Sequence, residues 1–411
     1  MTPARATAAD ELRRGWPVIL AAALGVSVGL TGLPFYTFGT FIKPLSESFG
    51  WLRSEIALGM MFLSAGTVLA GPLIGMLIDR YGVRVVALPS LVGLAVGFVA
   101  LSQAGPSLSS YYIGWLLVAL LGCATTPLAW TRVIGMQFDK ARGLALGLAL
   151  TGTGLAGIFG PIAMQRVMAA YDWRTGYLAM AAFVVIVVLP VAAFGLRRER
   201  GGSRGPTLVA RAGMRWQQAL ATRRFWVIAA SIFLMITAQA SATVHFVPML
   251  TDGGLAAGVA ASTLGLLGVS IIVGRVVVGL LVDRVHAPRV AAFFFVLPAL
   301  ALALLLWRVD SMTARTAAVL LGLAAGAEVD LLAYLVSRYF GLRAYGVIYG
   351  AQLSAFGIGA GLGPPLTGLI YDSTHSYSTA LIAGIGLFLT GAALMGTLGR
   401  YPVFAAAPEP A

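Results

Sequence analysis

Five ionisable side chains lie inside long apolar stretches of this sequence: Arg132, His245, Arg275, Glu328 and Asp330. Charged groups at that depth in an apolar helix are costly to bury, so they mark ion pairs, binding sites or proton pathways. A guanidinium group matches a carboxylate through two parallel N–H bonds, and a buried carboxyl group readily holds a proton. Together these residue types predict a site that binds an organic anion and exchanges protons.

Arg275 and the two acids lie at similar depths in two different stretches. Arg275 precedes Asp283 by eight residues, which at about 1.5 Å per residue places it about 12 Å from the charged end of its helix. Glu328 and Asp330 precede Arg338 by ten and eight residues. We therefore expect all three near the middle of a membrane. A resting ion pair between Arg275 and one acid, exchanged for substrate, is compatible with both the structural and the binding interpretation.

The two acids point to different sides of one helix, because residues two apart are separated by about 200°. Asp330 continues an i,i+4 stripe with Gly326 and Tyr334. We expect Asp330 and Tyr334 to face the transport pathway, and Glu328 to face a neighbouring helix or Arg275. Either acid is a candidate proton carrier, and a permanent ion pair is the alternative for each.

The elements that must position these residues are membrane-spanning helices. Of the 411 residues, 59% are hydrophobic and 10% are Asp, Glu, Lys or Arg, against about 25% charged residues in soluble domains. About 20 apolar residues in a helix cross a bilayer. The sequence predicts an all-α membrane protein with twelve such spans, at 17–42, 54–78, 85–104, 109–135, 143–168, 175–196, 224–250, 257–282, 289–307, 314–337, 345–370 and 378–399.

A polar stretch rich in Arg divides the spans into two sets of six. Its segment 212–222 predicts a short amphipathic helix at the membrane surface. Of the 28 Lys and Arg residues, 20 fall on the side of the termini and six on the opposite side, which predicts that both termini are cytoplasmic. The predicted parts are a tail (1–16), an N-terminal half (17–196), a linker (197–223), a C-terminal half (224–400) and a second tail (401–411).

The two halves repeat each other. Asp79-Arg80 recurs as Asp283-Arg284, and "YDWRTGY" (171–177) recurs as "YDSTHSY" (371–377). Both halves begin on the same side of the membrane, so they are parallel repeats about an axis along the membrane normal. Strings of glycine recur as well, and they predict close approach between helices.

The Asp-Arg pairs end apolar spans in a recognisable pattern. The sequence "GPLIGMLIDRYGVRVV" (71–86) and its degenerate copy "GRVVVGLLVDRVHAPRV" (274–290) contain G-x-x-x-D-R. With two six-span halves and a basic central loop, this pattern resembles the major facilitator superfamily over the whole chain. The resemblance implies a transporter that works by alternating access. It also implies a cytoplasmic gate, with simple stop charges as the alternative; the gate candidates are Asp79, Arg80, Arg84, Arg132, Asp139, Asp283, Arg284 and Arg338.

Two stretches narrow the resemblance. "GLPFYTFGTFIKPLSESFGW" (32–51) and "GAEVDLLAYLVSRYFGLRAYGVIYG" (326–350) resemble bacterial monocarboxylate transporters and the related oxalate/formate antiporters. The resemblance implies a substrate-binding Arg four residues before a Gly, which matches Arg275 and Gly279. Where some members carry an Asp four residues before that Arg, this chain has Ile271, so the proton carrier must lie elsewhere.

The resemblance also limits the substrate. The antiporters use a second cation in span eleven, and this chain has no Lys or Arg in 345–370, which implies one carboxylate on the substrate. His245, near the predicted outer end of span seven, is either a substrate or proton group or a hydrogen-bonded structural residue. The remaining candidate contacts are either pocket-lining or packing residues: Tyr36, Trp130, Tyr334 and Gln352.

We predict a secondary transporter of small organic monocarboxylates, coupled to protons and acting as a monomer in the bacterial cytoplasmic membrane among its lipids. The alternatives are an organic-anion exchanger without proton coupling, a drug efflux pump, and a sensor or scaffold that transports nothing. The single cysteine, Cys123, predicts neither disulfide nor metal cluster. Scattered basic residues argue against nucleic acid. No P-loop or catalytic constellation is present, so we expect no cofactor and no enzyme activity.

Overall fold

The computed structural model describes residues 8–138, 141–198, 213–282, 284–341 and 343–402, and every element that it names there is a helix. The predicted all-α architecture is therefore confirmed. The chain forms two compact units. Unit 1 comprises Met1–Trp51 and Phe62–Gly205, and unit 2 comprises Leu52–Met61 and Pro206–Ala411. The short segment 52–61 clusters with the second unit, which the sequence does not predict.

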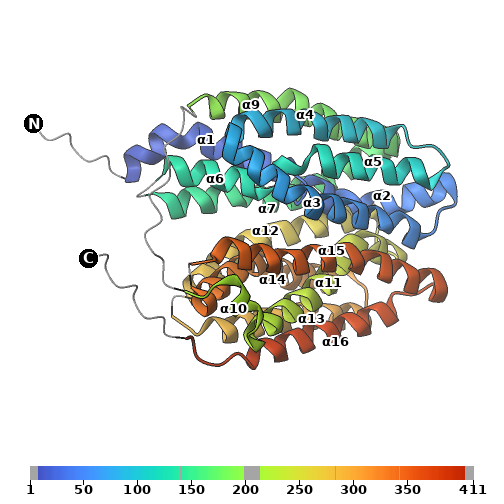
Figure 1. The fold of residues 1–411 in the computed structure, drawn as a ribbon. Coiled ribbons are helices and arrows are strands. Elements are labelled where there is room, and N and C mark those ends of the chain that lie inside the picture. The colour runs from blue at the N-terminus through green and yellow to red at the C-terminus, as the bar shows by residue number, and fades with distance from the viewer. Residues whose placement is uncertain (1–7, 139–140, 199–212, 283, 342, 403–411) are drawn as a thin grey trace, which may run out of the picture. The chain divides into compact units, whose positions relative to one another are not determined.

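Unit 1 is a bundle of helices of very different lengths (Figure 1). Its long helices match predicted spans to within a few residues, whereas three predicted spans are each built from two or three shorter pieces. The helices are α1 (Ala8–Val28), α2 (Leu33–Phe49), α3 (Arg53–Tyr81) from Phe62 onward, α4 (Val83–Ser102), α5 (Leu108–Leu121), η1 (Cys123–Thr125), α6 (Pro127–Gln137), α7 (Arg142–Ala170), α8 (Trp173–Phe183), the π-helix η2 (Val184–Val188), α9 (Leu189–Gly195) and η3 (Leu196–Arg198).

Glycine and proline cause the interruption of the first span. A Cβ atom on Gly29 would clash with the backbone oxygen of Thr125, and one on Gly32 would clash with the backbone oxygen of Ser27. Backbone therefore passes very close to backbone where α1 ends, and only residues without a side chain fit. Helix α2 then restarts with Pro34 in its first turn, a position where the missing N–H of proline costs no hydrogen bond.

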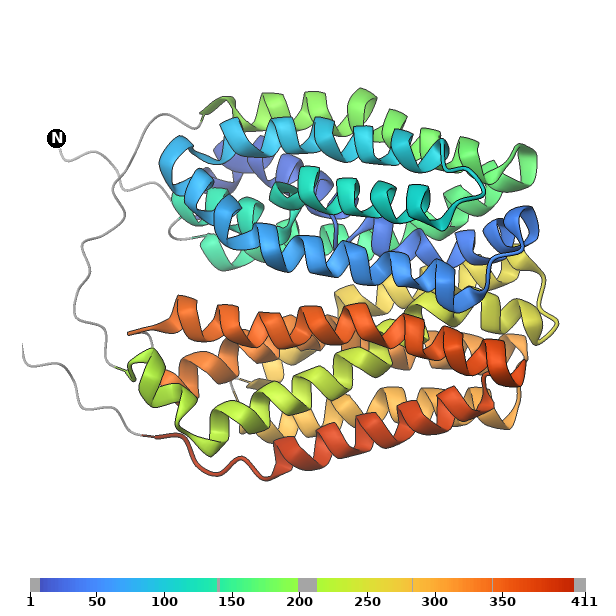
Figure 2. The same cartoon turned by 45° about the vertical axis from the view of Figure 1, so that its right-hand side comes forward.

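Unit 2 contains longer and more regular helices. Helices α13 and α16 run side by side at one edge of this unit (Figures 1 and 2). The predicted amphipathic helix corresponds to a five-residue helix, α10, and the linker residues 199–212 lie outside the described part. The helices are α10 (Trp216–Leu220), α11 (Arg223–Asp252), α12 (Ala257–Val282), α13 (Ala287–Trp307), α14 (Ser311–Phe340), α15 (Tyr345–Thr374) and α16 (Ser378–Gly396), together with the first turns of α3.

The helices of unit 2 are long and apolar enough to cross a membrane, apart from α10. Among the described residues of both units, ten helical segments meet this condition, and one of them, Ala9–Phe49, combines α1 and α2. Large apolar side chains also remain uncovered: Leu69 is 72% exposed, Ile186 71% and Trp307 76%. Such a surface is unsuited to water but matches lipid. The chain is a multi-pass membrane protein.

Acidic caps start two helices outside the apolar segments. The Asp310 carboxylate accepts hydrogen bonds from the backbone N–H groups of Met312 and Thr313, both at 2.9 Å, and begins α14. The Asp172 carboxylate accepts from the N–H of Thr175 at 2.7 Å and begins α8. The N–H of Thr313, followed by that of Met312, lowers the pKa of Asp310. Each cap satisfies donors that have no partner within the helix.

Candidate functional site

Glycines bring helices α12 and α14 into backbone contact. A Cβ atom on Gly274 of α12 would clash with the backbone oxygen of Leu323 in α14. A Cβ atom on Gly326 of α14 would clash with the oxygen of Ile271 and would lie 3.0 Å from the backbone N of Arg275. Gly326 therefore faces α12, while the predicted orientation of Asp330 and Tyr334 toward the pathway stays a prediction. The contact fixes Arg275 beside the acids of α14.

Arg275 interacts electrostatically with both acids of α14, Glu328 and Asp330. Glu328 is 4% exposed, and its Oε1 atom is buried without a hydrogen-bond partner among the described residues. Asp330 is partly exposed. One cation thus lies near two carboxyl groups, of which one is enclosed by helices and the other is accessible. We call Arg275, Glu328 and Asp330 the charged cluster.

Tyr349 of α15 joins the charged cluster, and sequence reasoning missed it. Its phenol interacts electrostatically with Asp330 and with Arg275. The ring stacks on Tyr345, one turn earlier, with centroids 5.5 Å apart and planes inclined by 6°. The sequence holds a signal for this pair, because tyrosines spaced i,i+4 in an otherwise apolar span share a face. A tyrosine pair carries no charge, so it does not stand out as a second cation would.

Two predicted substrate contacts, Gln352 and Trp130, are buried between helices in this structure. Gln352 is fully buried, and its Nε2 donates to the backbone oxygen of Phe225 in α11 at 3.1 Å. Trp130 is fully buried, its Nε1 donates to the oxygen of Thr125 at 3.2 Å, and its indole fills the space beside Gly25. Both side chains pack between elements of their own units, which favours the packing interpretation, and their contact with substrate stays a prediction.

His245 is also fully buried, with both ring nitrogens in hydrogen bonds. Nε2 lies 2.9 Å from the backbone oxygen of Pro364, and Nδ1 lies 3.2 Å from the hydroxyl of Tyr377. A carbonyl oxygen only accepts, so Nε2 must carry the hydrogen and Nδ1 must accept from the tyrosine. Both ring nitrogens are therefore engaged in this structure, which favours the hydrogen-bonded structural interpretation, and the substrate contact stays a prediction.

The other two candidate substrate contacts are Tyr334 and Tyr36, and both make aromatic contacts. Tyr334 is partly exposed, and the guanidinium of Arg338 lies 6.0 Å from its ring centroid. Tyr36 of unit 1 is 8% exposed and packs edge-to-face on Phe35, with centroids 5.3 Å apart. Neither arrangement tests a contact with substrate, so both remain predictions.

The predicted gate residues are only partly described. Asp139, Asp283 and the side chain of Asp79 lie outside the described part of the structure. The guanidinium of Arg338 lies 4.7 Å from the ring centroid of Tyr401, and that of Arg80 lies 5.3 Å from the ring centroid of Tyr81. The remaining gate arginines are surface residues: Arg132 and Arg284 are exposed, and Arg84 is half-buried. The gate remains a prediction.

Comparison with known proteins gives a match over most of the chain. The sequence profile described as Major Facilitator Superfamily matches residues 24–364. Human (Homo sapiens) monocarboxylate transporter 11 is 28% identical over 409 residues, which cover 95% of this chain and 84% of the relative. Monocarboxylate transporter 13 of Rattus norvegicus is 26% identical, covering 94% of this chain and 89% of the relative.

A fungal relative carries a different kind of name. The agnestins efflux protein AgnL12 of Paecilomyces divaricatus is 25% identical over 324 residues, which cover 77% of this chain and 71% of the relative. Similar proteins therefore include both proteins named as monocarboxylate transporters and one named as an efflux protein.

Proposed function

Because the chain belongs to the Major Facilitator Superfamily, we propose that it is a secondary active transporter of small organic monocarboxylates, working by alternating access with proton coupling. The observation that carries this proposal is the charged cluster, in which one arginine lies near two carboxyl groups inside the spans of unit 2. The names of the monocarboxylate transporters among the relatives support the same substrate class.

The substrate carboxylate exchanges with a protein carboxylate at Arg275. In the resting state the guanidinium is balanced by Asp330 and Glu328. A substrate anion takes two parallel N–H bonds from the guanidinium. An acid that loses its cation in a membrane interior is left as an uncompensated buried charge, which is strongly unfavourable. Taking up a proton removes that charge, so anion binding and proton binding become coupled.

Asp330 is the better proton carrier of the two acids. It is partly exposed, whereas Glu328 is nearly enclosed, so we expect proton exchange at Asp330 rather than at Glu328. Glu328 then remains as the permanent partner that holds the guanidinium in place. Tyr349 interacts electrostatically with both Arg275 and Asp330, so its hydroxyl is a candidate donor to an anion at the cluster. No Lys or Arg occurs in α15, which favours a substrate with one carboxylate.

Uptake into proteoliposomes tests the proposal. Radiolabelled lactate, pyruvate and an aromatic monocarboxylate are offered with and without an imposed inward proton gradient. We expect the gradient to accelerate net uptake and a protonophore to abolish the acceleration. Asp330→Asn removes the titratable group, so it should lose the response to the gradient but keep exchange of internal for external substrate. Asp172→Asn, outside the spans, is the matched control and should respond as the wild type does.

A second function is export of a less polar compound, favoured by the relative named as an efflux protein. An export pathway for neutral compounds does not need Arg275, so an Arg275→Gln variant would still transport them. An exchanger without proton coupling is the third arrangement. It would show full exchange of labelled anion with no response to the proton gradient in the wild type.

We further propose that the protein acts as a monomer in a bacterial cytoplasmic membrane, with the linker and both termini inside. The excess of Lys and Arg on that side supports this orientation. The gate residues Asp79, Asp139 and Asp283 belong to this proposal, which assigns them to the cytoplasmic end. Reporter fusions at either terminus test the orientation, because only a cytoplasmic terminus leaves a cytoplasmic reporter active.

A further inference from the structure

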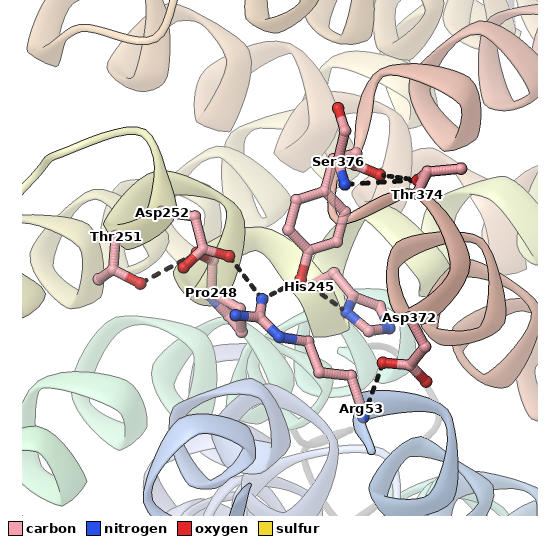
Figure 3. A network of polar contacts seen from close by, with 9 residues as sticks. Arg53, His245, Pro248, Thr251, Asp252, Asp372, Thr374 and Ser376 are labelled. Atoms are coloured by element: carbon pink, nitrogen blue, oxygen red, sulfur yellow. Dashed lines mark hydrogen bonds and ion pairs between the residues drawn. The ribbon is translucent and has the colours of Figure 1, made fainter. Parts of the chain in front are cut away.

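Arg53, the first residue of α3, joins the ends of three other helices within unit 2 (Figure 3). Its Nη1 atom lies 2.6 Å from Oδ2 of Asp252, at the end of α11. The same atom donates to the hydroxyl of Tyr377, just before α16, at 2.6 Å. Its guanidinium also lies 3.9 Å from the ring centroid of Tyr371, near the end of α15. One side chain therefore ties together elements that are far apart in the sequence.

The backbone of the same residue is held as well. The two oxygens of Asp372 accept from the N–H groups of Arg53 at 3.1 Å and Ser54 at 2.9 Å. A carboxylate here satisfies donors of the first turn of α3 and lies at the positive end of its dipole. Asp172, the counterpart of Asp372 in the internal repeat, caps its own following helix instead. Among the described residues, the two copies thus bind different backbone donors, near ones for Asp172 and distant ones for Asp372.

The network continues inward from Arg53 through Tyr377 to His245. Arg53 donates to the Tyr377 hydroxyl, which donates to Nδ1 of His245 at 3.2 Å, and Nε2 donates to the oxygen of Pro364 at 2.9 Å. Every hydrogen bond in this row has a fixed donor and acceptor, because an arginine only donates and a carbonyl only accepts. This row of hydrogen bonds, with its fixed donors and acceptors, holds α3, α11, α15 and the start of α16 in one arrangement.

The environment of this network differs from that of an ordinary surface ion pair. The Arg53 and Asp252 side chains are 12% and 25% exposed, whereas the Arg308–Asp310 pair of the same unit is 67% and 33% exposed. Exposed pairs contribute little because water screens them. Partners in a largely enclosed pair hold each other more firmly, since removing one leaves the other charge poorly solvated. Arg308 is therefore a matched control for Arg53.

We propose that Arg53, Asp252, Asp372 and Tyr377 form a latch that holds the first turn of α3 against the ends of α11, α15 and α16, and that this latch must open in each transport cycle. Helix α3 is continuous, yet its residues 52–61 cluster with unit 2 and its remainder, from Phe62, clusters with unit 1. In a transporter that alternates access, a helix shared in this way has to be released at one end. The inference rests on family membership and is independent of the cargo.

Cysteine accessibility tests the latch without any substrate. Ala57 is fully buried one turn beyond Arg53, and the native Cys123 is also buried. In a Cys123→Ala background, Ala57→Cys should react slowly with a membrane-impermeant maleimide applied from the side of Arg53. Adding Arg53→Gln should speed the labelling about tenfold or more, since opening is a population shift. Asp252→Asn should also speed the labelling, and it provides the test if the Arg53 variant fails to fold.

Two controls separate a latch from general loosening. Arg308→Gln removes the exposed arginine and should leave labelling at Ala57→Cys unchanged. Ala260→Cys, a fully buried position in α12, should stay slow to label in the Arg53→Gln variant. Unchanged labelling at Ala57→Cys in both Arg53→Gln and Asp252→Asn would overturn the proposal, and so would equally increased labelling at Ala57→Cys and Ala260→Cys. Because no substrate is present, neither result depends on the monocarboxylate assignment.

Discussion

The contact between α12 and α14 makes a sharp prediction about Gly326→Ala. The added Cβ atom would overlap the backbone oxygen of Ile271 and lie 3.0 Å from the N of Arg275. Neither atom is the flexible end of a side chain, so the two helices must move apart. Overpacking of this kind costs about 1–3 kcal/mol of stability. Displacing Arg275 by about 1 Å from the acids should also slow transport by about 100-fold.

Two measurements on purified protein in detergent test this reasoning. Thermal unfolding should show a lower Tm for Gly326→Ala, and proteoliposome uptake should show the loss of transport. Gly386→Ala in α16 is the matched control, because a Cβ atom there meets nothing within 4 Å and alanine favours the helix by about 1 kcal/mol. If Gly326→Ala unfolds and transports as the control does, the backbone contact does not position Arg275.

Three further predictions concern individual side chains. Asp310→Ala should lower the stability of the protein at neutral pH. Because the folded state depresses the pKa of Asp310 below its ordinary value of 3.8, the stabilising contribution is present above pH 3.8 and is lost as the carboxylate becomes protonated. Acid unfolding curves should therefore show that the stability difference between wild type and variant shrinks below pH 3.8. Gln352→Ala should lower the Tm through loss of its bond to Phe225 while leaving KM unchanged; a raised KM with normal Tm would instead identify Gln352 as a substrate contact. His245→Phe leaves the Pro364 oxygen and the Tyr377 hydroxyl without their partner, so unfolding should become easier by about 1–3 kcal/mol, and an unchanged midpoint would contradict the bonded role.

The helix pattern was largely predictable because apolar length alone defines a span. Helix α12 occupies 257–282, as predicted, and α4, α7, α11 and α13–α16 begin within three residues of their predicted starts. The break between α1 and α2 was not predicted. Glycine and proline are tolerated inside membrane helices, so this sequence is equally compatible with one continuous helix. Only the close approach of Thr125 to Gly29 shows why the helix stops.

The charged cluster was predictable for the same physical reason that charges are rare in spans. Arg275, Glu328 and Asp330 stand out in apolar sequence, and their similar depth suggested that they meet. Tyr349 was missed because tyrosine is common in membrane helices and carries no charge. It became a candidate only when α15 was seen to bring it to Arg275 and Asp330.

The Arg53 latch was not predictable from the sequence. Charges such as Arg53, Asp252 and Asp372 lie at the ends of spans, where they are ordinary and give no signal. Asp372 is 319 residues from Arg53 along the chain. No local pattern reports a pairing over that distance. The internal repeat does not predict the pairing either, because Asp172 and Asp372 occupy equivalent sequence positions but cap different helices.

Direct binding of a carboxylate to Arg275 is the central claim, and isothermal titration calorimetry tests it most directly. Wild type, Arg275→Lys and the control Arg308→Lys are titrated with a monocarboxylate that the uptake screen identifies and with its uncharged amide. We predict that the wild type and the control bind the acid and not the amide, and that Arg275→Lys binds the acid at least about tenfold more weakly, because a lysine cannot form the bidentate pair. Equal affinity of Arg275→Lys and the wild type for the acid would contradict the claim.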